Sequence, residues 1–397
     1  MTPVQPPFVD HHCHSLAPAW LSAAAEPAGG GSTGLLEPGA GPAWRCCFTE
    51  ATRPGSLARD VPGLLGYRRF LAALALHLGV DPTSSDGLET RVVAARDAAA
   101  AAGPGAYLRG LWDDAGIAAL LVDTGLDAAA LSPTHLAREG GRPVREVVRV
   151  ESVAEAVLGA GGRARATLGG FADAVEVRLH DALDAGAVAL KSIAAYRFGL
   201  ALPEHSMAQR HRAFRALGDD QARRFDDPVL GPFLVRQAAA LAAARGVPLQ
   251  LHTGFGDEDL DLATADPALL RPLFRDPHTE GCQVVLLHCY PFVGHAAYLA
   301  GTYPQVQLDL SLAIPLAEPL AEQLVREALG LCPVTKLLAA SDGHSFPEMH
   351  WWGVTVWRRA LGRALGAEVA MGTLDEPAAA AITRDVLAGN ATRLYRL

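Results

Sequence analysis

The feature that most constrains the fold is a series of short apolar runs that each end near a polar residue and lead into a helical segment. The chain contains eight such runs, at 7–12, 116–123, 144–151, 187–192, 247–252, 282–288, 306–311 and 335–342. Continuous apolar runs of this length are typical of parallel strands that helices bury on both faces. Clear intervening helices are predicted over 222–246 and 317–331.

Eight strand and helix units predict an α/β fold of the (β/α)8 TIM barrel type. The main competitor is an open doubly wound sheet, which the lack of a glycine-rich phosphate fingerprint after the first strand disfavours. We expect the barrel to comprise 1–16 and 113–397, with 17–112 inserted between the first two strands. Within the insertion, 25–44 has loop composition and 64–112 is helical. Its position predicts a lid or subdomain over the C-terminal mouth of the barrel.

The composition excludes several classes of partner. The chain has 397 residues and a formal net charge of −9, with no basic run that could neutralise phosphates, so no nucleic-acid partner is expected. It has neither a leader-like start nor about 18 continuous apolar residues, so we expect a cytoplasmic protein that binds no membrane. Its six irregularly spaced cysteines favour reduced thiols. A small molecule is the expected partner, and a homodimer is common among such barrels.

The first strand carries three histidines and an aspartate in the stretch VDHHCHSL. Alternate side chains of a strand share a face, so Asp10, His12 and His14 are predicted to point into the barrel. His11 and Cys13 are then predicted to point outward into packing, which rules out Cys13 as a nucleophile. A histidine pair at a strand end fits simple packing as well as it fits metal binding, so the pair alone does not specify a site.

Three further candidate ligands follow three other runs. His252, His288 and Asp342 each stand at the end of a predicted strand, and barrel active sites are built from the C-terminal ends of several strands. Four histidines and one aspartate at equivalent positions predict a metal centre. Nitrogen and oxygen ligands favour Zn2+, Mn2+, Fe2+, Ni2+ or Co2+ over Ca2+ or Mg2+.

These residues resemble the metal-site pattern of the amidohydrolase superfamily, and most closely its amidohydrolase-2 family. The matching segments are DHHCH at 10–14, LQLHTGFGDEDLDL around His252, VVLLHCYPF around His288, LLAASDGHSFPE around Asp342, and the closing GNATRLYRL at 389–397. The stretch ALKSIAAYRFGL at 189–200 is particularly similar to the amidohydrolase-like domain fused to glutamine synthetase in some plant and fungal proteins. The resemblance covers the first strand and about 187–397.

The resemblance implies roles for the ligand set. His12, His14, His252 and Asp342 would bind a first metal ion, and Asp342 would also take the proton of the attacking water. His288 would bind a second metal ion or act as a catalytic group that polarises the substrate. This agrees with general chemistry, because a divalent cation lowers the pKa of bound water to ~7 and a neighbouring carboxylate can accept the proton.

Lys191 ends the run at 187–192 and has two interpretations. In some branches of the superfamily a lysine at this position is carboxylated and bridges two metal ions. The alternative is an unmodified lysine that contacts a substrate carboxylate or balances nearby acids. Tyr196 and Arg197 follow in the next loop, where Arg197 could bind a carboxylate with two hydrogen bonds or form a surface ion pair.

Two further loops carry polar side chains that could reach the pocket. Asp257, Asp259 and Asp261 form an acidic loop that could bind a basic substrate group, although a solvated turn is the favoured interpretation. His344 and Glu348 follow Asp342 and are candidates for lining the pocket. The adjacent tryptophans at 351–352 are expected to pack a helix.

The sequence therefore predicts a hydrolase in which metal-activated water cleaves a C–N bond, amide or related, of a small amino-acid-derived or carboxylate-bearing substrate. One or two divalent transition metal ions, with Zn2+ as the first choice, would be bound. The first alternative is a non-oxidative decarboxylase or hydratase of the same family. The second is an inactive barrel with a binding or scaffold role, which the complete ligand set disfavours.

Overall fold

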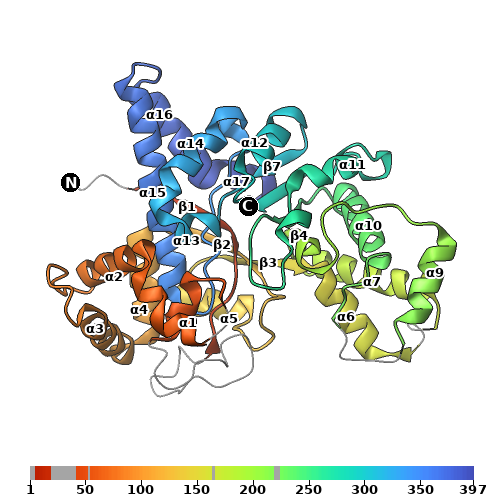
Figure 1. Ribbon diagram of the computed structural model, residues 1–397, viewed down its shortest axis with the longest axis horizontal. Coiled ribbons are helices and arrows are strands. Elements are labelled where there is room, and N and C mark those ends of the chain that lie inside the picture. Colours follow the sequence, from red (N-terminus) through yellow and green to blue (C-terminus); the bar gives the residue numbers. More distant parts are fainter. Residues whose placement is uncertain (1–4, 19–41, 52–53, 163–165, 219–223) are drawn as a thin grey trace.

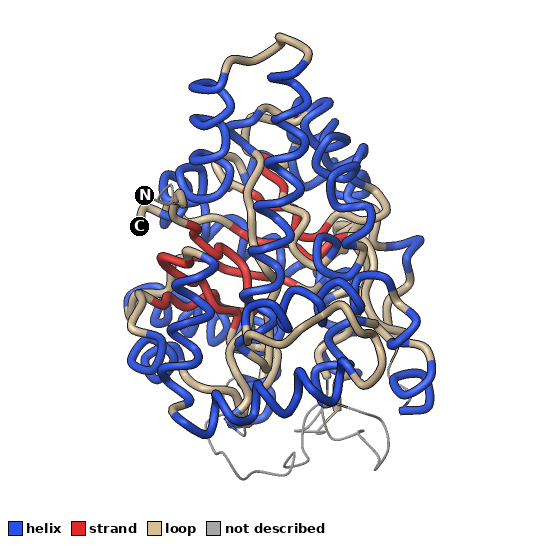
Figure 2. Tube along the Cα trace, turned by 90° about the vertical axis from the view of Figure 1, so that its left-hand side faces the viewer, coloured by secondary structure: helices blue, strands red, loops and turns tan. Residues whose placement is uncertain are grey.

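The strands of the computed structural model form one parallel sheet whose order follows the chain (Figure 1). The structure describes residues 5–18, 42–51, 54–162, 166–218 and 224–397. Figure 2 shows the strands curling together inside a surround of helices, so the chain has the predicted α/β barrel fold. The strands are β1 Phe8–Cys13, β2 Ile117–Asp123, β3 Val144–Arg149, β4 Ala189–Ser192, β5 Leu249–Thr253, β6 Val284–His288 and β7 Val306–Leu308.

Helices follow the strands and also fill the connection between β1 and β2. Both helices singled out from the sequence form, as α10 and α14. Gly246 closes α10 in a left-handed conformation with φ of 62°, which glycine adopts without the strain that a side chain adds. The helices are α1 Pro54–Arg59, α2 Leu65–His77, α3 Leu88–Ala102, α4 Pro104–Ala115, α5 Pro133–Gly140, α6 Val150–Ala160, α7 Leu168–Asp184, α8 Ala194–Arg197, α9 Met207–Ala216, α10 Leu230–Arg245, α11 Arg271–Phe274, α12 Val293–Thr302, α13 Ala313–Leu316, α14 Ala321–Leu331, α15 Pro347–Ala370, α16 Glu376–Arg384 and α17 Asn390–Tyr395.

The eighth predicted strand, 335–342, does not form a regular strand. It joins β7 through a single bridge between Leu308 and Leu337, and it joins β1 through a hydrogen bond from the Asp342 N–H to the His12 carbonyl of 3.1 Å. A side chain replaces one of the backbone hydrogen bonds of a regular strand pair, because the Asp10 carboxylate accepts from the Ser341 N–H at 2.9 Å. The segment thus lies between β7 and β1, where an eighth strand would close the barrel.

Strand β1 departs from regular alternation at its histidines. Between Asp10 and Cys13 it advances three residues while β2 advances two, from Leu120 to Val122. Such an extra residue is a bulge, which changes the direction of the side chains around it. As a result, the prediction that His11 points outward is wrong.

His11 instead enters the polar interior of the barrel. Its Nδ1 lies 3.1 Å from the Tyr395 hydroxyl and its Nε2 lies 2.9 Å from Asp309 Oδ2. Tyr395 belongs to α17 and packs with inward-facing apolar residues of the strands, among them Leu121 and Ala189. Those two residues precede Asp123 and Lys191 by one alternation of their strands, so α17 fills the barrel one layer below the strand ends.

Helices α1 to α4 occupy most of the described part of the connection between β1 and β2. Helix α15 anchors them, because buried Glu348 pairs with Arg96 of α3 at 2.7 Å and accepts from the Tyr107 hydroxyl of α4 at 3.0 Å. Trp352 packs edge-on against Phe70 of α2, as expected for the packing tryptophans. The loop predicted at 25–44 lies largely outside the described residues. Within the described part of the chain, no helix combines the length and apolar character needed to cross a membrane.

Candidate metal centre

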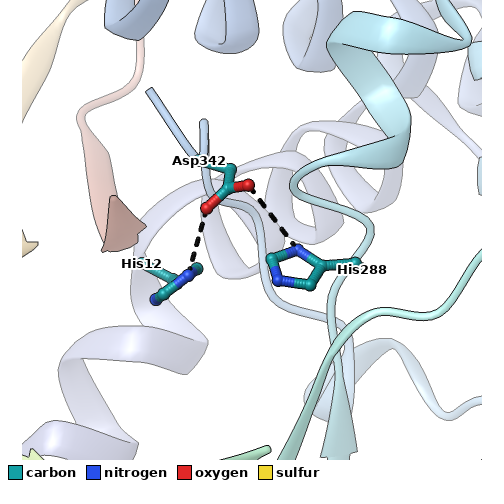
Figure 3. Close-up of side chains that lie close together, drawn as sticks. All are labelled: His12, His288 and Asp342. Carbon is teal, nitrogen blue, oxygen red and sulfur yellow. Dashed lines mark ion pairs between the residues drawn. The ribbon is translucent and has the colours of Figure 1, made fainter. Parts of the chain in front are cut away.

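Three of the predicted ligands meet at the C-terminal ends of the strands. One potential ligand atom from each of His12, His288 and Asp342 lies within 4.8 Å of the other two. Figure 3 shows Asp342 between the two imidazoles, with one carboxylate oxygen directed at each ring. Asp342 Oδ1 lies 3.1 Å from His12 Nε2, and Oδ2 lies 3.9 Å from His288 Nδ1.

The other two predicted histidines lie around this cluster. His14 Nε2 is 3.5 Å from Asp342 Oδ1. The His252 ring lies against the His288 ring with a centroid distance of 4.4 Å. The structure therefore brings all five predicted ligands together, although His14 and His252 lie outside the compact set of three.

Hydrogen bonds at the far side of the His12 ring determine which nitrogen faces the cluster. The Gln250 Nε2 group donates to the His11 carbonyl at 2.9 Å, which fixes the orientation of the amide because a carbonyl only accepts. The Gln250 Oε1 atom therefore faces His12 Nδ1, 3.0 Å away, and accepts its proton. In neutral His12 the Nε2 atom then carries the lone pair, and it faces Asp342 and the Lys191 ammonium group.

The same argument applies to His14 and His252. His14 Nδ1 donates to the Asp123 carbonyl at 3.1 Å, which leaves Nε2 free to bind a metal ion. His252 Nε2 donates to the Phe255 carbonyl at 3.1 Å, which leaves Nδ1 free. Second-shell bonds of this kind are the usual way in which proteins orient metal-binding imidazoles.

The histidines of the cluster are held in the neutral form that metal binding requires. Burial and the charge of Lys191 lower the pKa of His12 to about 4. The same two causes lower the pKa of His252 to about 3. Burial also holds the pKa of His288 well below its usual range, so these rings are uncharged at neutral pH, as metal binding requires.

Asp342 supplies the negative charge of the cluster, and its surroundings indicate whether a cation fits there. Burial alone would raise the pKa of its carboxyl group, but the neighbouring His288, His12 and His14 hold that pKa well below the usual range. Its Oδ1 is buried and accepts no regular hydrogen bond from the described residues. A buried acceptor left unpaired costs about 1–3 kcal/mol. The facing lone pairs of His12 and His14 make a shared cation the natural partner, so the donor set fits a divalent transition metal.

Backbone geometry holds two of the ligands in place. His288 and Asp342 both have left-handed backbone conformations, with φ of 69° and 52°. Such conformations cost of order 1–3 kcal/mol in non-glycine residues and concentrate at functional sites. The Asp309 carboxylate accepts from the His288 N–H at 2.8 Å, and Ser311 Oγ lies 2.8 Å from His288 Nδ1. These contacts fix the position of the ring at the end of β6.

Lys191 is buried beside the cluster in an ion-pair network. Its Nζ lies 2.9 Å from Asp123 Oδ2 and 3.1 Å from His12 Nε2. Arg149 pairs with the same Asp123 oxygen at 2.6 Å. Burial lowers the pKa of Lys191, while the Asp123 carboxylate opposes that effect. The Lys191 side chain is thus positioned to support His12 as well as to face the cavity.

A cavity of about 370 Å³ opens above the cluster. Its wall includes the predicted substrate-binding residues Lys191, Tyr196, Arg197 and His344. The Tyr196 ring packs against the His252 ring at 4.6 Å. Burial lowers the pKa of His344 to about 4, so His344 is a neutral polar group in this wall.

The segment between β1 and β2 forms part of the same wall. Its contributing residues are Cys46, Thr49, Glu50, Ala51 and Leu57. This placement supports the proposal that the insertion is a lid over the mouth of the barrel.

Two of the residues considered for the cavity wall lie outside it. Glu348 does not line the cavity, because its carboxylate is committed to Arg96 and Tyr107. Asp261 is exposed and caps a short 3-10 helix by accepting from the Ala263 N–H, in agreement with the favoured interpretation of a solvated turn. Asp257 and Asp259 do line the cavity.

Sequence reasoning missed several residues that complete the site. Asp123 ends β2 in the same way that His288 ends β6, so the rule of polar residues at strand ends could have found it. Gln250 and Glu50 carried no such signal, because one lies within a strand and the other lies in the insertion.

Comparison with known proteins establishes the family. The chain matches the model of the amidohydrolase family over residues 9–397 and belongs to that family. Protein fluG of Emericella nidulans is 35% identical over 228 residues, which are 54% of this chain and 26% of that protein. The chain therefore aligns with only about a quarter of the length of this relative. The predicted family resemblance is confirmed.

Solved structures agree with the fold. A protein from Lactobacillus casei, described as a metal-dependent hydrolase, has a TM-score of 0.82 at 26% identity, with 99% of this chain and 96% of that chain covered. A uronate isomerase from Thermotoga maritima has a TM-score of 0.68 at 14% identity, with 98% and 94% covered, and it shares the fold alone. Membership in the family implies an enzyme that uses a divalent metal ion, for which the His and Asp cluster is the candidate site.

Proposed function

We propose that this protein hydrolyses a C–N bond, amide or related, in a small amino-acid-derived or carboxylate-bearing substrate, with Zn2+ as the bound metal. The observation that carries the proposal is the unpaired, buried Asp342 oxygen among imidazole lone pairs at the base of a cavity. A bound divalent cation supplies two kinds of chemistry, polarisation of a carbonyl group and a lower pKa for a water molecule.

Asp342 acts as the general base in this proposal. Its carboxylate is ionised at neutral pH and is directed into the cavity from the end of the closing segment, so it can accept a proton from water and return it to the leaving nitrogen. His288, 3.9 Å from Asp342, is placed to stabilise negative charge that develops on the carbonyl oxygen.

Arg197 gives the proposal its substrate preference. Arg197 lines the cavity, and its Nε and Nη1 atoms are buried without a hydrogen-bond acceptor among the described residues. A guanidinium group with donors that lack acceptors is well suited to bind a carboxylate. We therefore assign the carboxylate of the substrate to Arg197, with Tyr196 and His344 beside it in the wall.

A decarboxylase or hydratase of the same family is the alternative reaction. The same ligand set would serve it, so the position of the substrate carboxylate separates the two. A carboxylate bound by Arg197 is held by the protein and retained in the product, as hydrolysis of a separate amide requires. An inactive barrel would not account for the buried, unpaired Asp342 oxygen. The isomerase reaction is not carried over, because those structures share only the fold.

The proposal is tested by product analysis with purified, metal-analysed protein. Carboxylate-bearing amides, including γ-glutamyl amides and N-acyl amino acids, would be incubated with the protein, and the release of amine or ammonia would be measured beside the release of carbon dioxide. We expect amine release that a chelator abolishes and Zn2+ restores. Carbon dioxide release without amine would establish the alternative reaction, and a metal-free protein that folds normally would refute the metal centre.

A further inference from the structure

Glu50 is a carboxylate of the cavity wall that no cation of the described chain neutralises. It lies in the connection between β1 and β2, is half-buried, and faces the same cavity as the metal cluster. Burial, followed by the charges of Asp342 and Asp257, raises the pKa of Glu50 to about 7. This corner of the cavity is therefore short of positive charge.

Three cationic side chains of the wall are already engaged elsewhere. Lys191 and Arg149 both contact Asp123, at 2.9 Å and 2.6 Å. Arg224 pairs with Asp259 at 2.7 Å. None of these pairs includes Glu50, so among the described residues its carboxylate is open to a cationic group of a molecule that enters the cavity.

Arg197 is a cation of the same wall that has few anionic partners. Its Nη2 lies 3.4 Å from Glu155 Oε1, which is too long for a strong charge-assisted hydrogen bond. Its Nε and Nη1 atoms have no acceptor among the described residues. Burial lowers the pKa of Arg197, as expected for a cation with few partners. One cavity thus contains an unmatched carboxylate and an under-matched guanidinium group.

We propose that Glu50 binds a primary ammonium group of the substrate while Arg197 binds its carboxylate, so that the substrate retains a free amino-acid group in addition to the bond that is cleaved. The inference rests on the proposed function and narrows its substrate class. An amide whose amino group is capped by an acyl group would leave Glu50 without a counter-charge. A substrate that has a free amino group and a carboxylate can pair with Glu50 and Arg197 at once. The cavity should therefore prefer such a substrate.

Binding of two matched probes tests the inference without turnover. L-Glutamate and glutarate have the same chain and the same two carboxylates, and only glutamate carries an ammonium group. Isothermal titration calorimetry on the full-length, metal-loaded protein would give both affinities. We expect wild-type protein to bind glutamate about tenfold more tightly or better, and Glu50→Gln to abolish that ratio while glutarate binding is retained. Arg197→Met is expected to weaken both ligands together.

Asp127→Asn is the matched control, since Asp127 is another carboxylate of the wall. Its Oδ1 accepts from the Ala129 N–H at 2.8 Å, an interaction that asparagine preserves. The control should keep the glutamate to glutarate ratio. Equal affinities in wild-type protein, an unchanged ratio in Glu50→Gln, or loss of metal in that variant would each overturn the inference.

A turnover measurement separates this inference from the proposed reaction. Wild-type protein should cleave a γ-glutamyl amide with a free amino group faster than its N-acetylated counterpart, and Glu50→Gln should remove that preference. If no amide is cleaved while the probes still discriminate, the reaction is wrong and recognition of the ammonium group stands. If both amides are cleaved equally, the reaction stands and the role of Glu50 is refuted.

Discussion

His12 Nε2 lies 3.1 Å from Asp342 Oδ1, and both atoms are acceptors when the ring is neutral. Gln250 takes the proton of the opposite ring nitrogen, and burial lowers the pKa of His12 to about 4, so no proton lies between the two atoms at neutral pH. Two acceptors at this distance repel each other unless a cation offsets the repulsion. Lys191 Nζ, 3.1 Å from His12 Nε2, offsets part of it, and a bound metal ion would offset the rest. This relationship makes the metal part of the stability of the site as well as of its chemistry.

Removal of either member should therefore remove the metal. We expect His12→Ala and the isosteric Asp342→Asn to lose most of the bound metal ion and to reduce turnover by about a thousandfold or more. Inductively coupled plasma mass spectrometry on purified protein would measure the metal, and circular dichroism would check the fold. His135→Ala, at a partly exposed histidine of α5, should retain the metal content of wild type. Full metal content in Asp342→Asn would contradict the assignment.

Lys191 is expected to be an unmodified ammonium group in a site with one metal ion. Carboxylation would place a new anion where Nζ now lies 2.9 Å from the Asp123 carboxylate, which like-charge repulsion opposes. Intact-mass measurement after incubation with bicarbonate should then show no added carbon dioxide, and metal stoichiometry should stay at about one. Added mass together with about two metal ions, which Lys191→Ala halves, would establish a bridging lysine instead.

The sequence was sufficient to predict the barrel and the convergence of the candidate ligands for a simple reason. Parallel strands place their C-terminal ends at one mouth, so polar residues that end apolar runs converge there regardless of their separation in the chain. His252 and His288 were found in this way. Residues whose position depends on packing were not predicted: the bulge in β1 turns His11 inward, and the position of Glu50 depends on how the insertion folds over the mouth.

The segment predicted as the eighth strand shows a second structural feature that a hydrophobic pattern cannot predict. Residues 335–342 have the composition of a buried strand, but Asp10 and Ser341 satisfy each other through side-chain contacts, and Asn390 of α17 donates to the Val334 and Leu337 carbonyls at 2.8 Å. A hydrophobic pattern does not reveal such replacements for ladder bonds. The closing Gly-Asn-Ala sequence therefore has a structural role in tying α17 to the last segment of the barrel.

The hydrogen bond between Gln250 and His12 allows a test of whether the His12 tautomer contributes to metal affinity. Gln250→Leu removes the acceptor for the His12 Nδ1 proton and should weaken metal binding by about 10–100-fold, which a competition titration with a chromophoric chelator measures. Tyr395→Phe is the matched control, because it removes the hydroxyl that accepts from Gln250 Nε2 at 2.9 Å while leaving the His12 contact intact. Equal losses in both variants would indicate a general packing effect.

Ionisation of Glu151 should make the stability of the folded protein depend on pH, independently of the metal ion. Its carboxylate is buried, with Oε1 accepting from Ser192 Oγ at 2.5 Å and from the Ile193 N–H at 3.1 Å, while Oε2 is buried without a partner among the described residues. Burial raises the pKa of Glu151, and its hydrogen bonds only partly offset that effect. The folded state therefore favours the protonated form relative to the unfolded chain, and ionisation costs stability as the pH rises through the pKa in the folded state.

Glu151→Gln should therefore stabilise the protein only where the wild-type carboxylate is ionised. The melting temperature of the variant should match that of wild type near about pH 4 and exceed it near about pH 8, because glutamine keeps the acceptor for Ser192 and carries no charge. Differential scanning fluorimetry across this range measures the difference. Glu176→Gln, at an exposed position of α7 with 48% side-chain exposure, should show a difference that does not change with pH. A constant offset for Glu151→Gln as well would mean that its ionisation is not linked to folding.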